Sequence, residues 1–406
     1  MMMKKIKILI TDNQKLIPVD GGAQVRIFNQ LKHLPNIFEV TYLGTTAYDS
    51  FLHKEKQITR NIKEVIVEIK KPILLFNSWL TKRVKGIHTF DVVIAICERF
   101  NREFKDNIKK YAKESDVLIA THPWFFPFLR KYKNKILIYD SHNCEYLLKR
   151  DLLRKTIIGR ILLGIIRKIE KQACKKSDLI FACSEENKKS FVNLYKVPGS
   201  KIKVLPNSVD INEIKPVSKK EKIRAKEKLG IKNKKTILFV GTYYGPNNEG
   251  FGFILEKLVP ELKDYVFMIA GNVNLYFYDL YGKNKKIPSN LKMFGKVDKQ
   301  KYLQILDASD IAINPMFSGS GLNIKMLDYM ASGIPTISTK IGARGLKILG
   351  EEVIVCDASE FKKEIKNLNA NKIKKMVKNS LDIIKKRYDS KKISKEFELH
   401  IKKMLK

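Results

Sequence analysis

Short runs of apolar and β-branched residues alternate with longer amphipathic stretches along most of this chain. Such alternation is typical of parallel sheets covered by helices, because each parallel strand reaches the next through a crossover that is usually helical. The strands expected in the first half are Ile6–Ile10, Val40–Leu43, Val65–Ile69, Val117–Ala120, Ile136–Tyr139, Leu179–Cys183 and Lys203–Leu205. Those expected in the second half are Thr236–Val240, Val266–Ala270, Leu291–Phe294, Ile311–Ile313, Thr336–Ser338 and Val353–Val355. We therefore predict an α/β fold built as two halves.

A basic segment separates the two series of strands. Residues from about Asn212 to Lys235 are rich in lysine and poor in large apolar side chains, as in a connection between domains. We predict an N-terminal domain over residues 1–210, a connecting segment over 211–235, a second domain over 236–385, and a C-terminal helix over 386–406 that packs back on the first domain. Open parallel sheets bind ligands outside the carboxyl ends of their strands, so the loops after the strands are where chemistry is sought.

In the first half, two kinds of loop residue are candidates. Gly21 and Gly22 precede a helix, where backbone N–H groups can approach an anion, and Arg26 follows one turn later. His122 and His142 each follow an expected strand, and a loop imidazole can hydrogen-bond a hydroxyl or a phosphate oxygen. The alternatives left open are an ordinary strand-to-helix turn for the glycines and polar surface for the histidines.

The first loop of the second half contains Gly241, Thr242 and Asn247 before a helix that is expected to begin near Glu249. Small and turn-forming residues leave backbone N–H groups free at such a helix start. The glycine signatures of nicotinamide dinucleotide sites and of P-loops are both missing from the chain.

The strongest segment runs from Pro315 to Ala331, where a strand enters a loop rich in glycine and serine and leaves as a helix. Backbone amides suited to a diphosphate are expected at Gly319, Ser320, Gly321, Leu322 and Asn323. Lys325 adds a positive charge in the first helical turn, and Asp328 on the same face can accept both hydroxyls of a ribose. The alternative is an ion pair between Lys325 and Asp328 on a solvated helix.

The formal net charge is +37, and a field of this size favours nucleic acid, anionic lipid or phosphorylated substrates. A lysine-rich composition without functional meaning is the alternative. Two basic amphipathic stretches, Lys70–Lys85 and Lys149–Lys176, are candidates for contact with an anionic membrane, unless they simply pack on the sheet. In the first of them one face is expected to carry Ile73, Phe76, Leu80 and Val84, with Trp79 beside it.

The cysteines and histidines are scattered without metal-ligand spacing. We therefore expect no metal site and no disulfide framework, and the pattern fits a reducing cytoplasm. The first ten residues are interpreted as a strand and not as a signal peptide, and no stretch is apolar enough to span a membrane.

At this point the motifs resemble a known family. The runs Gly319 to Thr339 and Ile341 to Leu346 look like the donor-binding region of family 4 glycosyltransferases, group 1 type, in a subgroup with Gly-Ser-Gly loops. Further similar segments are Pro18 to Arg26, Asp140 to Tyr146, Cys183 to Glu185, Pro206 to Asp210, Phe239 to Gly250 and Phe267 to Gly271. The resemblance implies the GT-B architecture, in which two Rossmann-like domains have parallel sheets facing a central cleft, and transfer that retains the anomeric configuration.

The resemblance also implies roles for single residues. Asp328 would bind the ribose of the donor nucleotide, and Lys325 with the amides of Gly319 to Asn323 would hold the pyrophosphate. Gly21 and Gly22 would contact the same pyrophosphate, and His122 would lie near the transferred sugar as a catalytic residue. One departure is Ser320, which stands where the family usually has a glutamate that contacts sugar hydroxyls.

The resemblance thus implies a metal-independent glycosyltransferase that uses a nucleotide-diphosphate sugar as donor substrate and needs no cofactor. Its acceptor is expected to be a glycan or a polyprenyl- or lipid-linked sugar. The expected location is the cytoplasm, with peripheral contact to the inner face of the cell membrane. Two other classes stay open: a non-catalytic sugar-nucleotide-binding partner of another transferase, and, least favoured, a basic nucleic-acid-binding protein.

Overall fold

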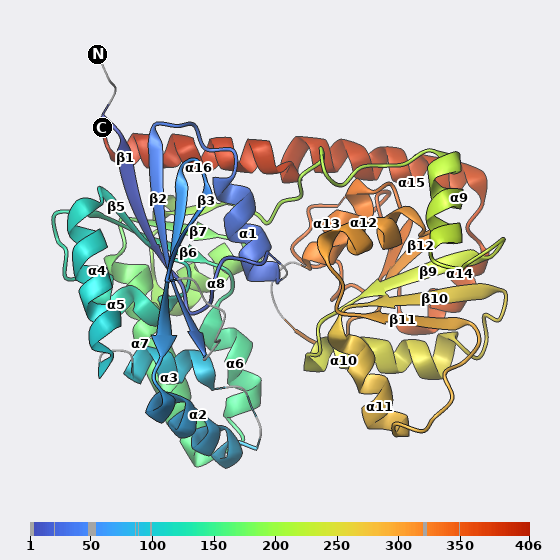
Figure 1. The fold of residues 1–406 in the computed structure, drawn as a ribbon, viewed down its shortest axis with the longest axis horizontal. Helices are drawn as coiled ribbons and strands as arrows, with labels where there is room; N and C mark the ends of the chain where they lie inside the picture. Colours follow the sequence, from blue (N-terminus) through green and yellow to red (C-terminus); the bar gives the residue numbers. More distant parts are fainter. Residues whose placement is uncertain are drawn as a thin grey trace. The chain divides into compact units, whose positions relative to one another are not determined.

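The computed structural model describes residues 4–19, 21–47, 54–85, 87, 89–97, 100–319, 323–348 and 350–406. The chain divides into two compact units (Figure 1). Unit 1 comprises Met1–Pro206 together with Ile393–Lys406, and unit 2 comprises Asn207–Lys392. The chain therefore passes from unit 1 to unit 2 and returns to unit 1 for its last helix.

Unit 1 contains an eight-stranded sheet in the order β3-β4-β2-β1-β5-β6-β7-β8. All described neighbours are parallel except β3, which runs antiparallel to β4 at one edge. The strands are β1 (Ile6–Thr11), β2 (Phe38–Ala47), β3 (Glu55–Thr59), β4 (Ile62–Ile69), β5 (Val117–Ala120), β6 (Ile136–Ser141), β7 (Leu179–Ala182) and β8 (Ile202–Val204). The sequence prediction missed β3 because its residues are polar and lie at the exposed edge.

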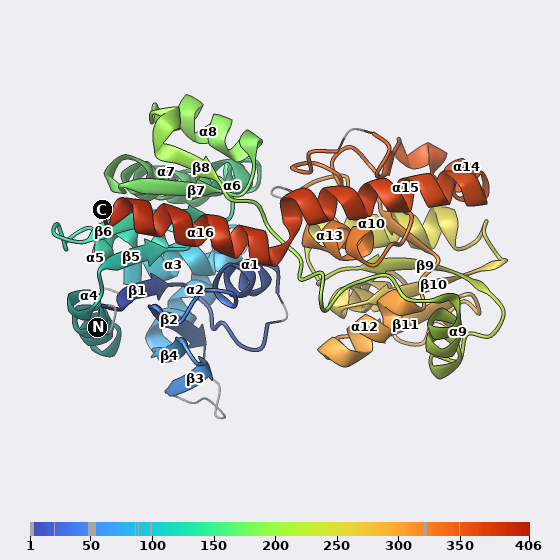
Figure 2. The ribbon, with the colours of Figure 1, turned by 90° about the horizontal axis from the view of Figure 1, so that it is seen from above.

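Helices cover both faces of this sheet, and each face has its own apolar core. One core contains Ile27 and Leu31 of α1 and Phe397 of α16, and Figure 2 shows α16 lying along the sheet of unit 1. The other core is formed by most of the remaining helices. The helices of unit 1 are α1 (Gly22–Leu31), α2 (Lys71–Arg83), α3 (Phe90–Cys97), α4 (Arg102–Glu114), α5 (Phe126–Leu129), α6 (Glu145–Leu153), α7 (Ile157–Lys176), α8 (Glu185–Tyr195) and α16 (Ser390–Met404).

Unit 2 contains a six-stranded sheet in the order β11-β10-β9-β12-β13-β14, and its described pairings are all parallel. The strands are β9 (Lys235–Val240), β10 (Tyr265–Ala270), β11 (Leu291–Gly295), β12 (Ile311–Asn314), β13 (Thr336–Ser338) and β14 (Ile354–Val355). The helices are α9 (Lys219–Lys228), α10 (Gly245–Phe253), α11 (Leu275–Tyr281), α12 (Lys299–Asp307), α13 (Ile324–Ala331), α14 (Phe361–Lys366) and α15 (Ala370–Ile383). This strand order is that of the doubly wound nucleotide-binding fold.

The unit boundary lies after Pro206, close to the expected end of the first domain at residue 210. The segment 211–235 belongs to unit 2, where Ala225 of α9 is part of the core, so it is not a separate connection. Residues 393–406 belong to unit 1, whereas residues 386–392, the start of the segment predicted as the C-terminal helix over 386–406, belong to unit 2.

Candidate functional site

The strand order reverses between β9 and β12 in unit 2, and between β1 and β5 in unit 1. At such a point the loops that follow the two strands diverge and leave space for a ligand. In unit 2 these loops begin at Gly241 and Pro315, and in unit 1 they begin at Asp12 and Thr121. All predicted loop candidates except His142 follow one of these four strands.

Three predicted donor residues are connected in unit 2. The ammonium of Lys325 donates a hydrogen bond of 2.8 Å to Asn247 Oδ1, and Asn247 Nδ2 donates to the Thr242 carbonyl oxygen at 3.0 Å. The buried Gly241 lies directly before this turn, at the end of β9. Because α10 begins at Gly245 and not near Glu249, Asn247 lies in the first turn of the helix. The amides of that turn therefore lie close to Lys325.

The electrostatic setting of Lys325 favours an incoming anion. Its Nζ atom lies 4.5 Å from the centroid of the buried Phe239 ring. Among the described residues no carboxylate forms an ion pair with it. Burial lowers the pKa of Lys325 to about 7, so a phosphate group placed beside it would restore its full charge.

Asp328 lies on the same helix and has a different partner. The Tyr302 hydroxyl donates a hydrogen bond of 2.7 Å to Asp328 Oδ2. Burial raises the pKa of this carboxyl to about 7, although the bond from Tyr302 acts in the opposite direction. The structure therefore does not contain the simple i,i+3 ion pair with Lys325 that the sequence left open.

The loop before α13 is held by contacts within unit 2. Gly319 has a φ of +107°, a conformation that favours glycine, and its carbonyl oxygen accepts a hydrogen bond from the Arg344 guanidinium. Asn323 precedes the helix and donates to the Gly342 carbonyl oxygen at 2.9 Å. Ser320, Gly321 and Leu322 lie outside the described residues, so their predicted roles stay predictions.

The predicted glycines of unit 1 lie at the start of α1. Gly21 precedes the helix with an extended backbone (φ −116°), and Gly22 is its exposed first residue. A methyl group at Gly21 would meet only the end of the flexible Gln24 side chain. The backbone conformation therefore does not require glycine at Gly21, and contact with a diphosphate stays a prediction for both residues.

Arg26 is the predicted donor residue whose contacts argue against that role. Its guanidinium is buried and lies 2.6 Å from Asp140 Oδ1, and it also donates to the Leu205 carbonyl oxygen at 2.8 Å. Both partners lie far along the chain, so sequence spacing gave no sign of them. Arg26 joins α1 to β6 and to the end of β8, and is a structural residue in this fold.

His122 lies among carboxylates at the end of β5. Its Nδ1 atom is 3.2 Å from Glu145 Oε1. Burial opposes a charge on His122, but the bond with Glu145 and the charges of Asp12, Glu145 and Asp91 outweigh burial and raise its pKa to about 9. The ring is therefore an imidazolium at neutral pH and donates hydrogen bonds.

His142 lies beside it and has the opposite protonation state. The centroids of the two imidazole rings are 4.5 Å apart. Burial, followed by the charges of His122 and Arg26, lowers the pKa of His142 well below its usual value. Its Nε2 atom is buried and has no hydrogen-bond partner among the described residues. The pair thus offers one charged ring and one neutral ring with an unsatisfied nitrogen.

Sequence reasoning missed the acids that organise this pair. Asp12 follows β1 and accepts a hydrogen bond of 2.7 Å from Thr121 Oγ1, directly before His122. The fully buried Glu170 on α7 accepts hydrogen bonds from the backbone amides of Glu145 at 2.6 Å and of Tyr146 at 3.1 Å. Glu170 thereby fixes the start of α6, which carries the partner of His122. Its neighbours in the sequence are mostly polar or charged, so nothing in the sequence marked it as buried.

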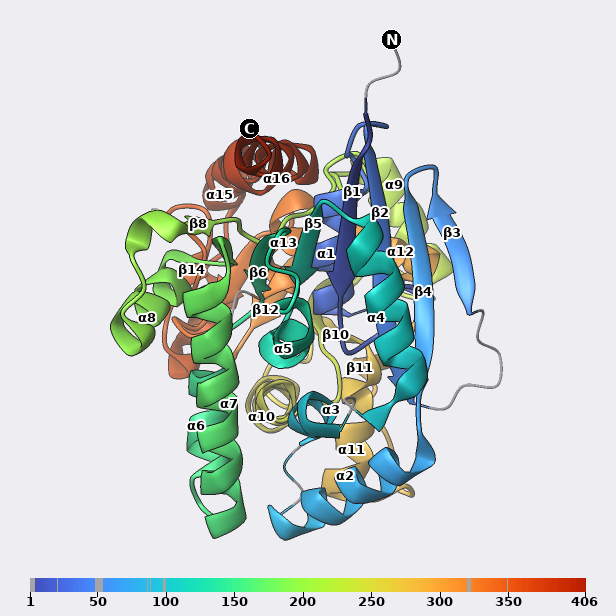
Figure 3. The ribbon, with the colours of Figure 1, turned by 90° about the vertical axis from the view of Figure 1, so that its left-hand side faces the viewer.

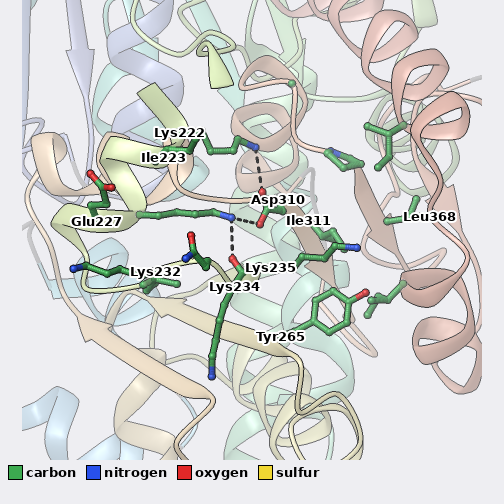
Figure 4. Close-up of a pocket in the computed structure, with 17 residues that line it drawn as sticks. Lys222, Ile223, Glu227, Lys232, Lys234, Lys235, Tyr265, Asp310, Ile311 and Leu368 are labelled. Carbon is green, nitrogen blue, oxygen red and sulfur yellow. Dashed lines mark hydrogen bonds and ion pairs between the residues drawn. The ribbon is translucent and has the colours of Figure 1, made fainter. Parts of the chain in front are cut away.

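A separate hollow of about 620 Å³ lies at the opposite edge of the unit 2 sheet (Figure 4). Its wall includes Lys235 and Ile311, which begin β9 and β12, so it lies at the amino ends of the strands. One of its lysines, Lys226, is neutralised by Asp310 at 2.5 Å. Because ligands of parallel sheets bind at carboxyl ends, this hollow is not the donor site.

Within the described ranges, no three side chains of His, Cys, Asp or Glu are grouped so that they could hold a metal ion. The described helices also include none that is both long and apolar enough to cross a bilayer.

Comparison with known proteins gives the same picture for both halves. Residues 20–213 match the family described as Glycosyltransferase Family 4, and residues 234–371 match the family described as Glycosyl transferases group 1. An uncharacterised glycosyltransferase of Methanocaldococcus jannaschii is 27% identical over 98% of both chains.

Two further relatives match over part of their length. An uncharacterised protein of the cps region of Klebsiella pneumoniae is 32% identical over 39% of this chain and 43% of its own length. An Escherichia coli enzyme named UDP-Gal:alpha-D-GlcNAc-diphosphoundecaprenol alpha-1,3-galactosyltransferase is 27% identical over 44% of this chain and 47% of its own. The chain thus spans less than half the length of these two relatives.

Solved structures match the fold over nearly the whole chain. Anabaena HepE in complex with UDP-glucose has a TM-score of 0.70 and 15% identity, covering 98% of this chain and 100% of its own. Sucrose-phosphate synthase from Thermosynechococcus elongatus has a TM-score of 0.74 and 12% identity, covering 99% of each chain. With its two doubly wound parallel sheets and its two family matches, this chain belongs to the family 4, group 1 glycosyltransferases of GT-B fold.

Proposed function

We propose that this chain transfers a sugar from a nucleotide-diphosphate sugar to a glycan or lipid-linked acceptor, with retention of the anomeric configuration. The observation that carries the proposal is Lys325, a partly buried cation at the switch point of unit 2 that pairs with no described carboxylate. HepE was solved with UDP-glucose, and the E. coli relative is named for a UDP-sugar donor and a lipid-linked acceptor. Both names support this donor class.

In the proposed donor complex, Lys325 and the backbone amides at the starts of α10 and α13 bind the diphosphate. Asn247 contacts both the lysine and the Thr242 turn, which supports this arrangement. Positive charge that is fixed before the reaction stabilises the negative charge that develops on the leaving diphosphate. Asp328 accepts hydrogen bonds from the ribose hydroxyls through the carboxylate that Tyr302 contacts.

In unit 1 we assign His122 the role of a hydrogen-bond donor. As an imidazolium it gives a hydrogen bond to a hydroxyl of the transferred sugar, and its pKa of about 9 makes it a poor base at neutral pH. The acceptor hydroxyl attacks the anomeric carbon from the side that the diphosphate leaves, and a diphosphate oxygen takes its proton. No protein nucleophile and no metal ion take part, so a chelator is expected to leave turnover unchanged.

The first test is calorimetric binding of UDP, GDP, TDP, ADP and CMP to the wild type and to Asp328→Ala. Micromolar binding of one nucleotide, weakened in the variant, supports the donor site and selects the activated sugars for transfer assays. Folded protein that binds none of the five would overturn the proposal. Nucleotide binding without transfer to any acceptor would favour the alternative function, a non-catalytic partner of another transferase.

A lipid-linked acceptor requires the enzyme to reach a bilayer. We therefore also propose that the chain acts in the cytoplasm, at the inner face of the cell membrane.

A further inference from the structure

A hollow of about 340 Å³ lies between α6 and α7 in unit 1. Tyr146, Leu163 and Gly164 are among the residues that line it. Gly164 has no side chain to fill the hollow, and no atom lies within 4 Å of where its Cβ would stand. Four arginines surround it: Arg150, Arg154, Arg160 and Arg167. Guanidinium groups bind phosphate through paired hydrogen bonds, so this composition suits a phosphate group.

The described residues leave most of this positive charge uncompensated. Asp151 Oδ1 lies 3.3 Å from Arg150 Nε and 3.7 Å from Arg154 Nη1. No described carboxylate pairs with Arg160 or Arg167, and the Arg167 guanidinium lies over the Tyr146 ring at 5.5 Å from its centroid. Only one described carboxylate lies beside four arginines, so the hollow carries a net positive charge that attracts an anion.

The same hairpin of α6 and α7 carries exposed apolar side chains. Ile157 is 71% exposed and Ile161 is 59% exposed, one turn apart at the start of α7, and Leu152 at the end of α6 is 46% exposed. Burying such side chains in a bilayer surface is favourable, whereas leaving them in water is not. Phosphate-binding arginines next to apolar side chains match the two chemical layers of a lipid surface.

Helix α2 presents a second exposed apolar stripe at this end of unit 1. The sequence predicted Ile73, Phe76, Leu80 and Val84 as one apolar face, but Ile73, Leu80 and Val84 are buried in the core. The exposed stripe is instead Leu75, Phe76 and Trp79, with Arg83 over the Trp79 ring at 5.2 Å. Helix α3 contacts both α2 and α7, and Figure 3 shows α2 and the α6–α7 hairpin at the same edge of unit 1.

We propose that this edge docks unit 1 on an anionic phospholipid bilayer. The four arginines of the α6–α7 hollow bind headgroup phosphates, and the exposed side chains of α2 and α7 enter the boundary between headgroups and acyl chains. The physiological role rests on the proposed function, because it places the enzyme where a lipid-linked acceptor is found. Docking itself depends only on these residues and can be measured without any donor.

The test is flotation of the full chain with phosphatidylcholine vesicles, with and without phosphatidylglycerol. We expect binding only to the anionic vesicles, and about thirtyfold weaker binding for the double variant Arg160→Gln/Arg167→Gln. Ile157→Ser/Ile161→Ser is expected to weaken binding even at high salt, where charge is screened. The matched control is Lys232→Gln/Lys234→Gln, which removes two charges from the exposed rim of the unit 2 hollow.

Equal loss in the control would overturn the proposal, because it would show that net charge alone drives binding. Wild type that fails to float with anionic vesicles at low salt would overturn it too. Inorganic phosphate and chloride are then compared as competitors at matched salt concentration. Stronger displacement of the wild type from vesicles by phosphate would support the arginine site, whereas equal displacement by the two anions would contradict it. Nucleotide binding, measured on every variant, separates failure of docking from failure of the proposed transfer.

Discussion

Asn247 Oδ1 accepts a hydrogen bond of 2.8 Å from Lys325 Nζ, although the two residues are 78 positions apart in the chain. The partner is a neutral amide, so it orients the ammonium without cancelling its charge. Its Nδ2 atom also holds the turn at Thr242. Asn247 is therefore a positioning residue that aims a lysine at the switch point of the sheet.

Replacing Lys325 by Met should lower kcat/KM by about a hundredfold to a thousandfold, because the charge acts on the leaving diphosphate. The Met side chain has similar length and packs on Phe239, so the free energy of unfolding should change little. Steady-state transfer and chemical denaturation measure the two effects. Unchanged kinetics would remove Lys325 from the mechanism.

Binding of a nucleoside diphosphate should be accompanied by uptake of a proton near pH 8. Lys325 has a pKa of about 7 in the free protein, so it is mostly neutral at pH 8, and the bound diphosphate raises that pKa. Calorimetry in two buffers of different ionisation enthalpy gives the number of protons. The Lys325→Met variant is the control, and an uptake that persists in it would point to another group.

Tyr302→Phe should make nucleoside binding more sensitive to acid. The Tyr302 hydroxyl lowers the pKa of Asp328, and burial has raised that pKa to about 7. Removing the hydroxyl therefore raises the pKa further, and the carboxylate that accepts ribose hydroxyls is lost at higher pH. Titrations with the free nucleoside across pH 6 to 9 isolate this effect from Lys325, and identical profiles would contradict it.

Glu145→Gln should bring the pKa of His122 down from about 9 toward its usual value, because the hydrogen bond that the ring donates to a carboxylate is lost. NMR titration of the ring measures this shift directly. The raised pKa also contributes stability that is fully present below about pH 6.5 and is lost as the pH rises through about 9. As the pH rises from about 6.5 to about 9, the unfolding free energy of the wild type should therefore decrease more than that of the variant. The difference between the two proteins removes the contribution of all other titrating groups.

Gly271→Ala should destabilise unit 2 much more than Gly282→Ala. Both glycines have positive φ, +93° and +81°, so an alanine at either position adopts an unfavourable backbone conformation that costs about 1–3 kcal/mol. A methyl group at Gly271 would also lie 2.2 Å from the Gly241 carbonyl oxygen, whereas none of the surrounding atoms comes within 4 Å at Gly282. Denaturant titrations compare the two, and equal losses would show that the β9 loop moves aside.

The sheets could be predicted from the sequence because buried parallel strands are continuous apolar runs. The loop candidates were found for the same reason, since Lys325 and His122 follow such strands at a fixed end. The buried ion pair of Arg26 was not foreseen because its partner Asp140 lies 114 positions away, and no local pattern encodes that pairing. Glu170 was missed because a buried carboxylate within an amphipathic helix looks like any surface glutamate.

The last helix has a consequence for how the chain is made. Phe397 and Ile401 of α16 are core residues of unit 1, packed with Ile8 and Ile10 of the first strand. During synthesis the ribosome completes all of unit 2 before these residues emerge. The part of the first sheet that α16 covers therefore stays open to water until that helix is made, and unit 1, although begun first, is completed after unit 2.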